Sequence, residues 1–195
     1  MTGLIILAAG ESARLGQPKQ NLVFGDKTLL QNAVETALAS VCEPIIVVLG
    51  ANEQIIRPTI SHYPVNIVHN ADWAEGMASS IRRGVAEMKK DPQVTSVILM
   101  LCDQPFVSTG LLNELAAAGA ENDIVACVYN NTAGVPVLFN AKYLEQLQLL
   151  TGDEGAKHLL LKYGEDVLYI PFPMGGVDID TMNDFEKLKR SGNLS

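Results

Sequence analysis

The chain has 195 residues, of which 48% are hydrophobic and 18% are charged, so it can bury a sizeable core and is not a disordered segment. Its formal net charge of −8 argues against a general affinity for nucleic acid or for anionic membranes, because both require a basic surface. The three cysteines, Cys42, Cys102 and Cys127, are widely spaced and odd in number, which argues against a disulfide framework or a zinc site. No segment has the features of a secretory leader or the length of a membrane-spanning helix, and we therefore expect a protein of the reducing cytoplasm.

Apolar strand-like runs alternate with amphipathic helix-like segments along the chain. Several of the runs are β-branched and continuously apolar, as expected for strands that are buried on both faces of a parallel sheet. Ser108 and Thr181 are suitable N-cap residues. The predicted elements, in chain order, are strand 4–8, helix 29–40, strand 45–49, helix 53–60, strand 65–68, helix 77–90, strand 94–101, helix 109–118, strands 124–128 and 135–139, helices 142–147 and 154–163, strands 167–170 and 177–179, and helix 182–190.

This alternation predicts an α/β fold with a doubly wound, mostly parallel sheet and helices on both faces. After residue 128 the alternation breaks down, so we expect an elaboration around residues 129–176 within one domain that spans residues 1–195. Ligands of such sheets bind beyond the carboxyl ends of the strands. Polar turns follow three predicted strands, at residues 10–19, 102–105 and 178–184, and we expect them to converge in space.

The turn after the first strand reads LAAGESARLGQPK, from Leu7 to Lys19. It fits neither the Walker pattern nor the dinucleotide-binding fingerprint. Gly10 can nevertheless allow backbone N–H groups to approach an oxyanion, Arg14 offers a planar fork for phosphate oxygens, and Lys19 adds a compact charge. From these residue types alone, phosphate binding and an ordinary solvated surface loop both remain open.

Carboxylates follow two other predicted strands. Asp103 comes directly after an apolar strand, where it could bind Mg²⁺, or it could be a turn aspartate before Pro105. Asp178 and Asp180 are two residues apart on a predicted strand, so both would point to the same face. Asp180 could instead cap the following helix, although Thr181 could serve as that cap.

A third polar stretch begins the predicted helix 77–90. Gly76, Ser79 and Ser80 could present hydroxyl and N–H groups to a nucleotide, or they could simply cap the helix. The three histidines have no metal-like spacing, and we expect structural or surface roles for them.

Taken together, these stretches resemble the MobA-like nucleotidyltransferases, and most closely their molybdenum cofactor cytidylyltransferase branch. The matching motifs are LAAGESARLGQPK, CDQP from residue 102, DIDT from residue 178, NADWAEGMASSIRRG from residue 70, GVPVLF from residue 134 and GDEGAK from residue 152. The chain departs from the family pattern at residues 182–184, at Ala71, and at Lys157, where the family has arginine.

The resemblance implies a Rossmann-like nucleotidyltransferase fold and a role for each matching residue. Arg14, Lys19 and Asp103 are implied to be catalytic, and Mg²⁺ is expected on Asp103 and Asp180, with Asp178 as an alternative ligand. The nucleotide-binding residues implied are Leu7, Ala8, Ala9, Gly10, Arg14, Lys19, Gly76, Ser79, Ser80 and Asp103. The acceptor-binding residues implied are Gly134, Pro136, Asp153, Gly155 and Lys157.

The implied reaction is the transfer of CMP from CTP to the phosphate of the molybdopterin cofactor, with release of pyrophosphate. In this family an alanine at the position of Ala9 is associated with cytidine nucleotides, and a molybdoenzyme or its chaperone would receive the product. An acceptor phosphate is already ionised, so no strong general base is needed. The alternatives are a transferase that uses another nucleotide or a sugar or polyol phosphate, a nucleotide-sugar glycosyltransferase with Asp178-Ile179-Asp180 as its D-x-D motif, and a non-catalytic nucleotide-binding module.

Overall fold

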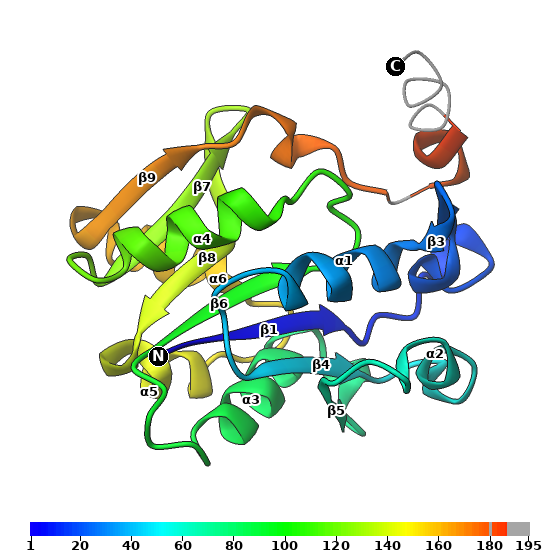
Figure 1. Cartoon of the computed structure of the whole chain (residues 1–195), viewed down its shortest axis with the longest axis horizontal. Coiled ribbons are helices and arrows are strands. Elements are labelled where there is room, and N and C mark those ends of the chain that lie inside the picture. Colours follow the sequence, from blue (N-terminus) through cyan, green and yellow to red (C-terminus); the bar gives the residue numbers. More distant parts are fainter. Residues whose placement is uncertain (180, 187–195) are drawn as a thin grey trace.

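A seven-stranded sheet forms the centre of the computed structural model, which describes residues 1–179 and 181–186, with the backbone alone at Arg14. The strand order is β5-β4-β1-β6-β8-β7-β9, and every neighbouring pair is parallel except for the two pairs that contain β8 (Figure 1). The strands are β1 (Thr2–Ala8), β4 (Ile45–Leu49), β5 (Asn66–His69), β6 (Ser96–Leu101), β7 (Ile124–Tyr129), β8 (Thr132–Asn140) and β9 (Val167–Pro171). The short strands β2 (Val23–Phe24) and β3 (Lys27–Thr28) form a separate hairpin.

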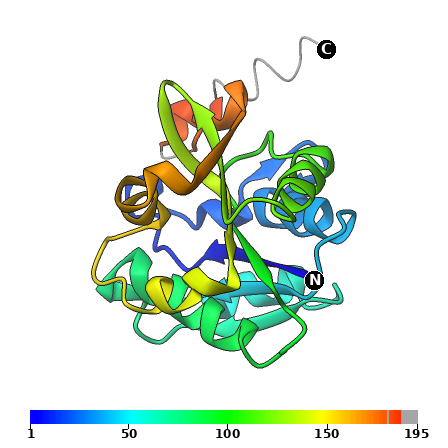
Figure 2. The same ribbon diagram turned by 90° about the vertical axis from the view of Figure 1, so that its left-hand side faces the viewer.

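Helices cover both faces of this sheet (Figure 1, Figure 2). One face packs against α1, α2 and α4, and the other face packs against α3, α5 and α6. Successive side chains of β1 alternate between the two cores, with Leu4 and Ile6 in one and Ile5 and Leu7 in the other. The doubly wound, mostly parallel fold predicted from the sequence is therefore confirmed. The helices are α1 (Leu29–Leu38), α2 (Glu53–Ile60), α3 (Met77–Met88), α4 (Thr109–Ala118), α5 (Leu144–Gln148) and α6 (Ala156–Lys162).

Side-chain caps fix the starts of several helices. The hydroxyl of Ser108 accepts a hydrogen bond from the N–H of Leu111, and Thr181 accepts one from the N–H of Asp184, so both predicted N-caps are confirmed. Thr28 and Gln31 form a capping box at the start of α1.

The predicted strand at residues 177–179 is wrong. The chain makes a 3₁₀ turn over Pro173–Gly176 and then runs through residues 177–179 without pairing to the sheet. The apolar residue that suggested a strand, Ile179, is instead buried in a small cluster with Leu15, Leu29 and Phe185 beneath the first loop. Asp178 therefore does not lie on a strand, so it has no strand face to share with Asp180, and Asp180 lies outside the described residues.

Candidate active site

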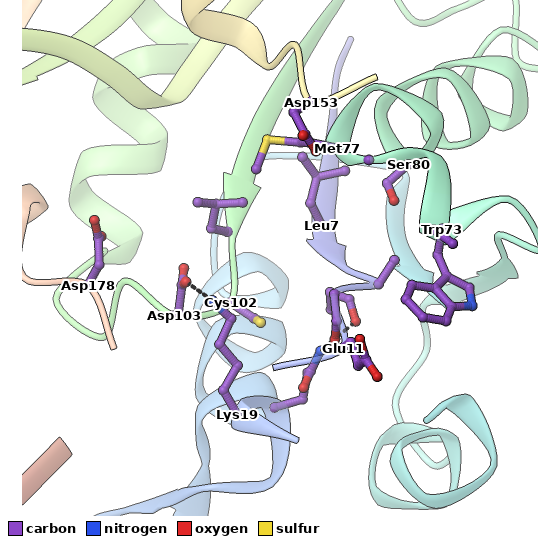
Figure 3. Close-up of a pocket in the computed structure, with 17 residues that line it drawn as sticks. Leu7, Glu11, Lys19, Trp73, Met77, Ser80, Cys102, Asp103, Asp153 and Asp178 are labelled. Atoms are coloured by element: carbon purple, nitrogen blue, oxygen red, sulfur yellow. Dashed lines mark hydrogen bonds and ion pairs between the residues drawn. The ribbon is translucent and has the colours of Figure 1, made fainter. Parts of the chain in front are cut away.

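A pocket of about 540 Å³ lies beyond the carboxyl ends of β1 and β6 (Figure 3). The end of β1, the turn after β6, the start of α3 and the segment after the 3₁₀ turn all contribute to it, so the three predicted polar turns do converge. The structure places these predicted site residues along its lining: Leu7, Ala8, Ala9, Gly10, Lys19, Gly76, Ser80, Asp103, Asp153 and Asp178. The side chain of Arg14 is not described.

Two polar side chains, those of Gln20 and Ser12, hold the loop after β1 in shape. Gln20 is fully buried, and its Nε2 donates to the carbonyl oxygens of Ala8 at 2.8 Å and Gly10 at 3.0 Å. The hydroxyl of Ser12, in a left-handed conformation, accepts a hydrogen bond from the N–H of Lys19 at 3.0 Å. Gln20 was not predicted as a site residue, because no periodic signal distinguishes a buried amide from a solvated one.

Lys19 and Asp103 form an ion pair across the pocket (Figure 3). Their side chains are 21% and 6% exposed, so the pair is largely removed from water. Lys19 contacts Oδ2 of the carboxylate, while Oδ1 is buried and, within the described part of the chain, has no hydrogen-bond partner. A buried, unsatisfied carboxylate oxygen is costly unless a donor or a cation meets it.

The Asp103 carboxylate is therefore suited to a hard divalent cation, which prefers oxygen ligands. Within residues 1–179 and 181–186, no three His, Cys, Asp or Glu side chains lie close enough together to hold a metal by themselves. A metal at Asp103 would thus complete its shell with phosphate oxygens, water and the other predicted carboxylates, Asp180 or Asp178. Burial, together with the neighbouring Asp103 charge, raises the pKa of the Cys102 thiol to about 12.

Gln104 connects the Asp103 turn to two distant segments. The side chain is buried, and its Nε2 donates to the carbonyl oxygens of Gly175 at 2.9 Å and Val135 at 3.2 Å. The first of these bonds fixes the 3₁₀ turn that precedes Asp178. The role of Gln104 was not predicted, because its partners are far away in the sequence and two of the three, the third being the Tyr129 hydroxyl, are backbone carbonyls.

The predicted acceptor residues Gly134 and Pro136 lie on β8 and are not among the residues that line the pocket. A Cβ at Gly134 would lie 2.4 Å from the hydroxyl oxygen of Tyr129, so the absent side chain permits that close packing. Pro136 is buried and follows a cis peptide bond. Burial raises the pKa of the Tyr129 phenol.

The start of α3 packs against the loop between α5 and α6. Gly76 has φ of +122°, and a Cβ there would lie 2.4 Å from the carbonyl oxygen of Gly152, so glycine is needed both for the backbone and for the contact. Beyond it, Asn70 donates to the hydroxyls of Ser79 at 2.8 Å and Ser80 at 3.0 Å. Of these two serines, Ser80 lines the pocket and Ser79 does not, so a direct contact of Ser79 with nucleotide stays a prediction.

The remaining predicted acceptor residues are divided between two places. Asp153 lines the pocket, and Gly155 packs close to the Sδ of Met77 beside it. Lys157 is exposed on α6 and lines a different groove of about 500 Å³ with Thr132 and Tyr169. The structure does not bring Lys157 to the main pocket, and its predicted role remains untested.

Ala9 is tightly packed at the end of β1. A Cβ at Gly50 would lie 2.9 Å from the Cβ of Ala9 and 2.6 Å from that of Trp73, so the three residues make one close-packed wall. The carbonyl oxygen of Ala9 also accepts a hydrogen bond from the N–H of Ala51 at 3.0 Å. The methyl group of Ala9 is therefore held in place at the pocket surface.

In the part of the chain that the structure describes, no helix is both long and apolar enough to cross a membrane.

Three curated proteins are similar to the chain over nearly their full lengths. The nicotine blue oxidoreductase of Paenarthrobacter nicotinovorans is 29% identical, with 94% of each chain covered. The purine catabolism protein PucB of Bacillus subtilis is 25% identical, with 96% of this chain and 95% of PucB covered. The molybdenum cofactor cytidylyltransferase of Escherichia coli is 26% identical, with 93% of this chain and 92% of the relative covered.

Solved structures are also similar to the chain over nearly its full length. The homologue of Rv0371c from Mycobacterium sp. strain JC1 matches with a TM-score of 0.86 and 31% identity, covering 100% of this chain and 98% of its own. Rv0371c of Mycobacterium tuberculosis in complex with manganese matches with a TM-score of 0.80 and 28% identity, covering 97% and 98%. The family model described as the MobA-like NTP transferase domain matches residues 4–167. The chain belongs to this family of nucleotidyltransferases.

Proposed function

We propose that the protein transfers CMP from CTP to the phosphate of a molybdopterin-type cofactor and releases pyrophosphate, with Mg²⁺ as the metal. The observation that carries the proposal is the pair of Lys19 and Asp103 at the pocket, with Oδ1 of Asp103 buried and lacking a hydrogen-bond partner among the described residues. The similarity to a molybdenum cofactor cytidylyltransferase supports the choice of acceptor, and the manganese complex of a related protein supports a divalent cation.

Different residues of the chain would act at the α-phosphate and at the leaving pyrophosphate. Asp103 would hold the ion through Oδ1, together with Asp180, and Asp178 is an alternative ligand. The bound ion supplies charge neutralisation at the α-phosphate. Lys19 would exchange its contact with Asp103 for a phosphate oxygen and, with Arg14, would stabilise the charge that develops on the leaving pyrophosphate.

The packing of Ala9 supports a pyrimidine as the base. Its methyl group lies at the pocket surface, and neither Gly50 nor Trp73 leaves room for it to move back. Since a fixed methyl group takes up space that a larger purine would need, CTP fits the proposal better than GTP.

Asp153 supports a pterin as part of the acceptor. It lies at the pocket beside Met77, away from the Lys19 side (Figure 3). A carboxylate can accept hydrogen bonds from two adjacent N–H donors, and the pterin ring presents such a pair. The names of the nicotine blue oxidoreductase and of PucB do not refer to the molybdenum cofactor, so the identity of the acceptor is tested directly.

The test is to incubate the purified protein with Mg²⁺, molybdenum cofactor and each of the four nucleoside triphosphates, and to measure pyrophosphate. We expect release that depends on both CTP and the cofactor. Faster release with GTP would contradict the base assignment, and release with a sugar or polyol phosphate in place of the cofactor would contradict the acceptor. Trp73 is the only tryptophan and lines the pocket, so its fluorescence reports nucleotide binding independently. Binding without release in any mixture would favour a non-catalytic module.

A further inference from the structure

The loop of residues 149–155 is tied to α3 by a set of contacts that centre on Arg82. The Nη1 of Arg82 donates to the carbonyl oxygen of Leu150 at 2.7 Å, and its Nη2 donates to Oε2 of Glu75 at 2.6 Å. The backbone carbonyl of Arg82 accepts a hydrogen bond from Nε2 of Gln148 at 2.7 Å, at the end of α5. One arginine therefore holds both the beginning of the loop and the 3₁₀ turn before α3.

The same loop touches the pocket through its other end. The carbonyl oxygen of Gly152 accepts a hydrogen bond from the N–H of Ala78 at 3.1 Å, and the loop lies directly over Gly76. A hydrogen bond from Arg82 lowers the pKa of Glu75, and a backbone hydrogen bond from Gly152 contributes in the same direction. Asp153 follows at once and lines the pocket.

These contacts separate the two sides of the pocket. On the phosphate side, Lys19, Gln20 and Asp103 belong to segments other than those that Arg82 bonds, whereas Asp153 belongs to the loop that Arg82 holds. Gly76 and Ser80, at the start of α3, lie between these two sides. We propose that Arg82 is a positioning residue that fixes the 149–155 loop, and that through Asp153 it governs the binding of the acceptor rather than of the nucleotide. The acceptor part of this statement rests on the proposed function.

The neighbouring residue provides a matched control. Arg83 has the same side chain on the same helix but points elsewhere, donating to the carbonyl oxygen of His69 at 3.0 Å and pairing with Glu87 at 3.7 Å. Removal of Arg83 should therefore cost a comparable amount of charge and helix propensity and leave the 149–155 loop in place.

The first measurement is hydrogen exchange of the peptides that cover residues 149–155, which needs no acceptor. In Arg82→Ala we expect exchange to rise about tenfold, because a charged donor bonded to a carbonyl is lost. In Arg83→Ala it should remain at the wild-type value. Glu75→Gln tests the same network without removing Arg82, and it decides the matter if Arg82→Ala does not fold; we expect about a threefold rise there.

The second measurement separates acceptor from nucleotide. In Arg82→Ala the dissociation constant for CTP, read from Trp73 fluorescence, should change less than about twofold, while the KM for molybdenum cofactor in the pyrophosphate assay should rise about tenfold. Equal loop exchange in the Arg82 and Arg83 variants would overturn the proposal, as would a loss of CTP affinity as large as the loss for the acceptor. If the wild-type protein releases no pyrophosphate, the proposed function fails, and the exchange and CTP measurements still decide whether Arg82 positions the loop.

Discussion

Replacement of Gln104 by leucine tests whether one buried amide holds the two walls of the pocket together. Leucine has a similar volume but donates nothing, so the carbonyl oxygens of Gly175 and Val135 each lose a hydrogen bond. Each lost bond costs about 1 kcal/mol net, and more where a buried carbonyl is left without a partner. Part of this is recovered, because the Oε1 of Gln104 is itself buried without a partner among the described residues. We expect a net loss of about 2 kcal/mol in the free energy of unfolding.

The effect on turnover should be larger than the effect on stability. Asp178 lies shortly after Gly175 and lines the pocket together with Asp103 (Figure 3). Release of the 3₁₀ turn would displace Asp178, while Asp103 would remain in the turn directly after β6. Misplacement of a site residue by about 1 Å can cost on the order of 100-fold in rate, so we expect kcat/KM for pyrophosphate release to fall about 10- to 100-fold.

Urea denaturation and the pyrophosphate assay measure the two effects separately. With a denaturant slope of about 2 kcal/mol/M, the unfolding midpoint of Gln104→Leu should fall by about 1 M. Gln54 is an exposed glutamine on α2, so Gln54→Leu serves as the control and should stay within about 0.5 kcal/mol of wild type. A Gln104→Leu protein with wild-type stability and full turnover would refute the reasoning.

Three further changes test the site and the core. Asp103→Asn removes the charge that a divalent ion would need, so pyrophosphate release should fall about 10³-fold; a variant that keeps most of its activity would place the metal elsewhere. Ala9→Gly opens the wall beside Gly50, and the ratio of kcat/KM for GTP to that for CTP should rise about tenfold, whereas an unchanged ratio would remove Ala9 from base selection. Burial raises the pKa of the Cys127 thiol from 9.0 to about 12, so above pH 9 the unfolded chain releases a proton that the folded chain keeps. The contribution of the protonated Cys127 thiol to the free energy of unfolding is fully present below pH 9. It is lost by about 1.4 kcal/mol per pH unit as the pH rises toward 12. In Cys127→Ala the fall in unfolding free energy from pH 9 to 11 should be shallower than in wild type by that amount per unit, and equal slopes would contradict it.

The helices and the longer strands could be predicted because the spacing of apolar residues in short stretches of sequence indicates which face is buried. The helices Glu53–Ile60 and Thr109–Ala118 and the strand Ile45–Leu49 have the bounds that the apolar pattern predicts. The hairpin of Val23–Phe24 and Lys27–Thr28 was not predicted, since strands of two residues are too short to show a period. The strand at residues 177–179 was predicted wrongly because an apolar residue indicates burial and does not identify the partner.

The candidate site was predictable where it depends on the carboxyl ends of strands, and not where it depends on distant backbone atoms. Lys19 and Asp103 follow β1 and β6, and neighbouring parallel strands bring their ends together. Gln20, Gln104 and Arg82 act through hydrogen bonds to carbonyl groups, which every residue has. Sequence cannot distinguish which carbonyl a polar side chain will reach, and only the folded chain provides that information.

The charge of the pocket explains why an acidic protein would need a metal to bind a triphosphate. Among the described side chains that line it, Glu11, Asp103, Asp153 and Asp178 are carboxylates and Lys19 is the one cation. Lys19 is already paired with Asp103, so its positive charge is compensated within the protein until a cation neutralises that carboxylate. A divalent cation at Asp103 would do this and would also attract the phosphates, which links metal binding to the release of Lys19 for the nucleotide. In the proposed site, the local positive charge that the net charge of −8 calls for would thus come from Lys19, Arg14 and the ion together, and the Oδ1 of Asp103, which lacks a hydrogen-bond partner among the described residues, would hold the ion.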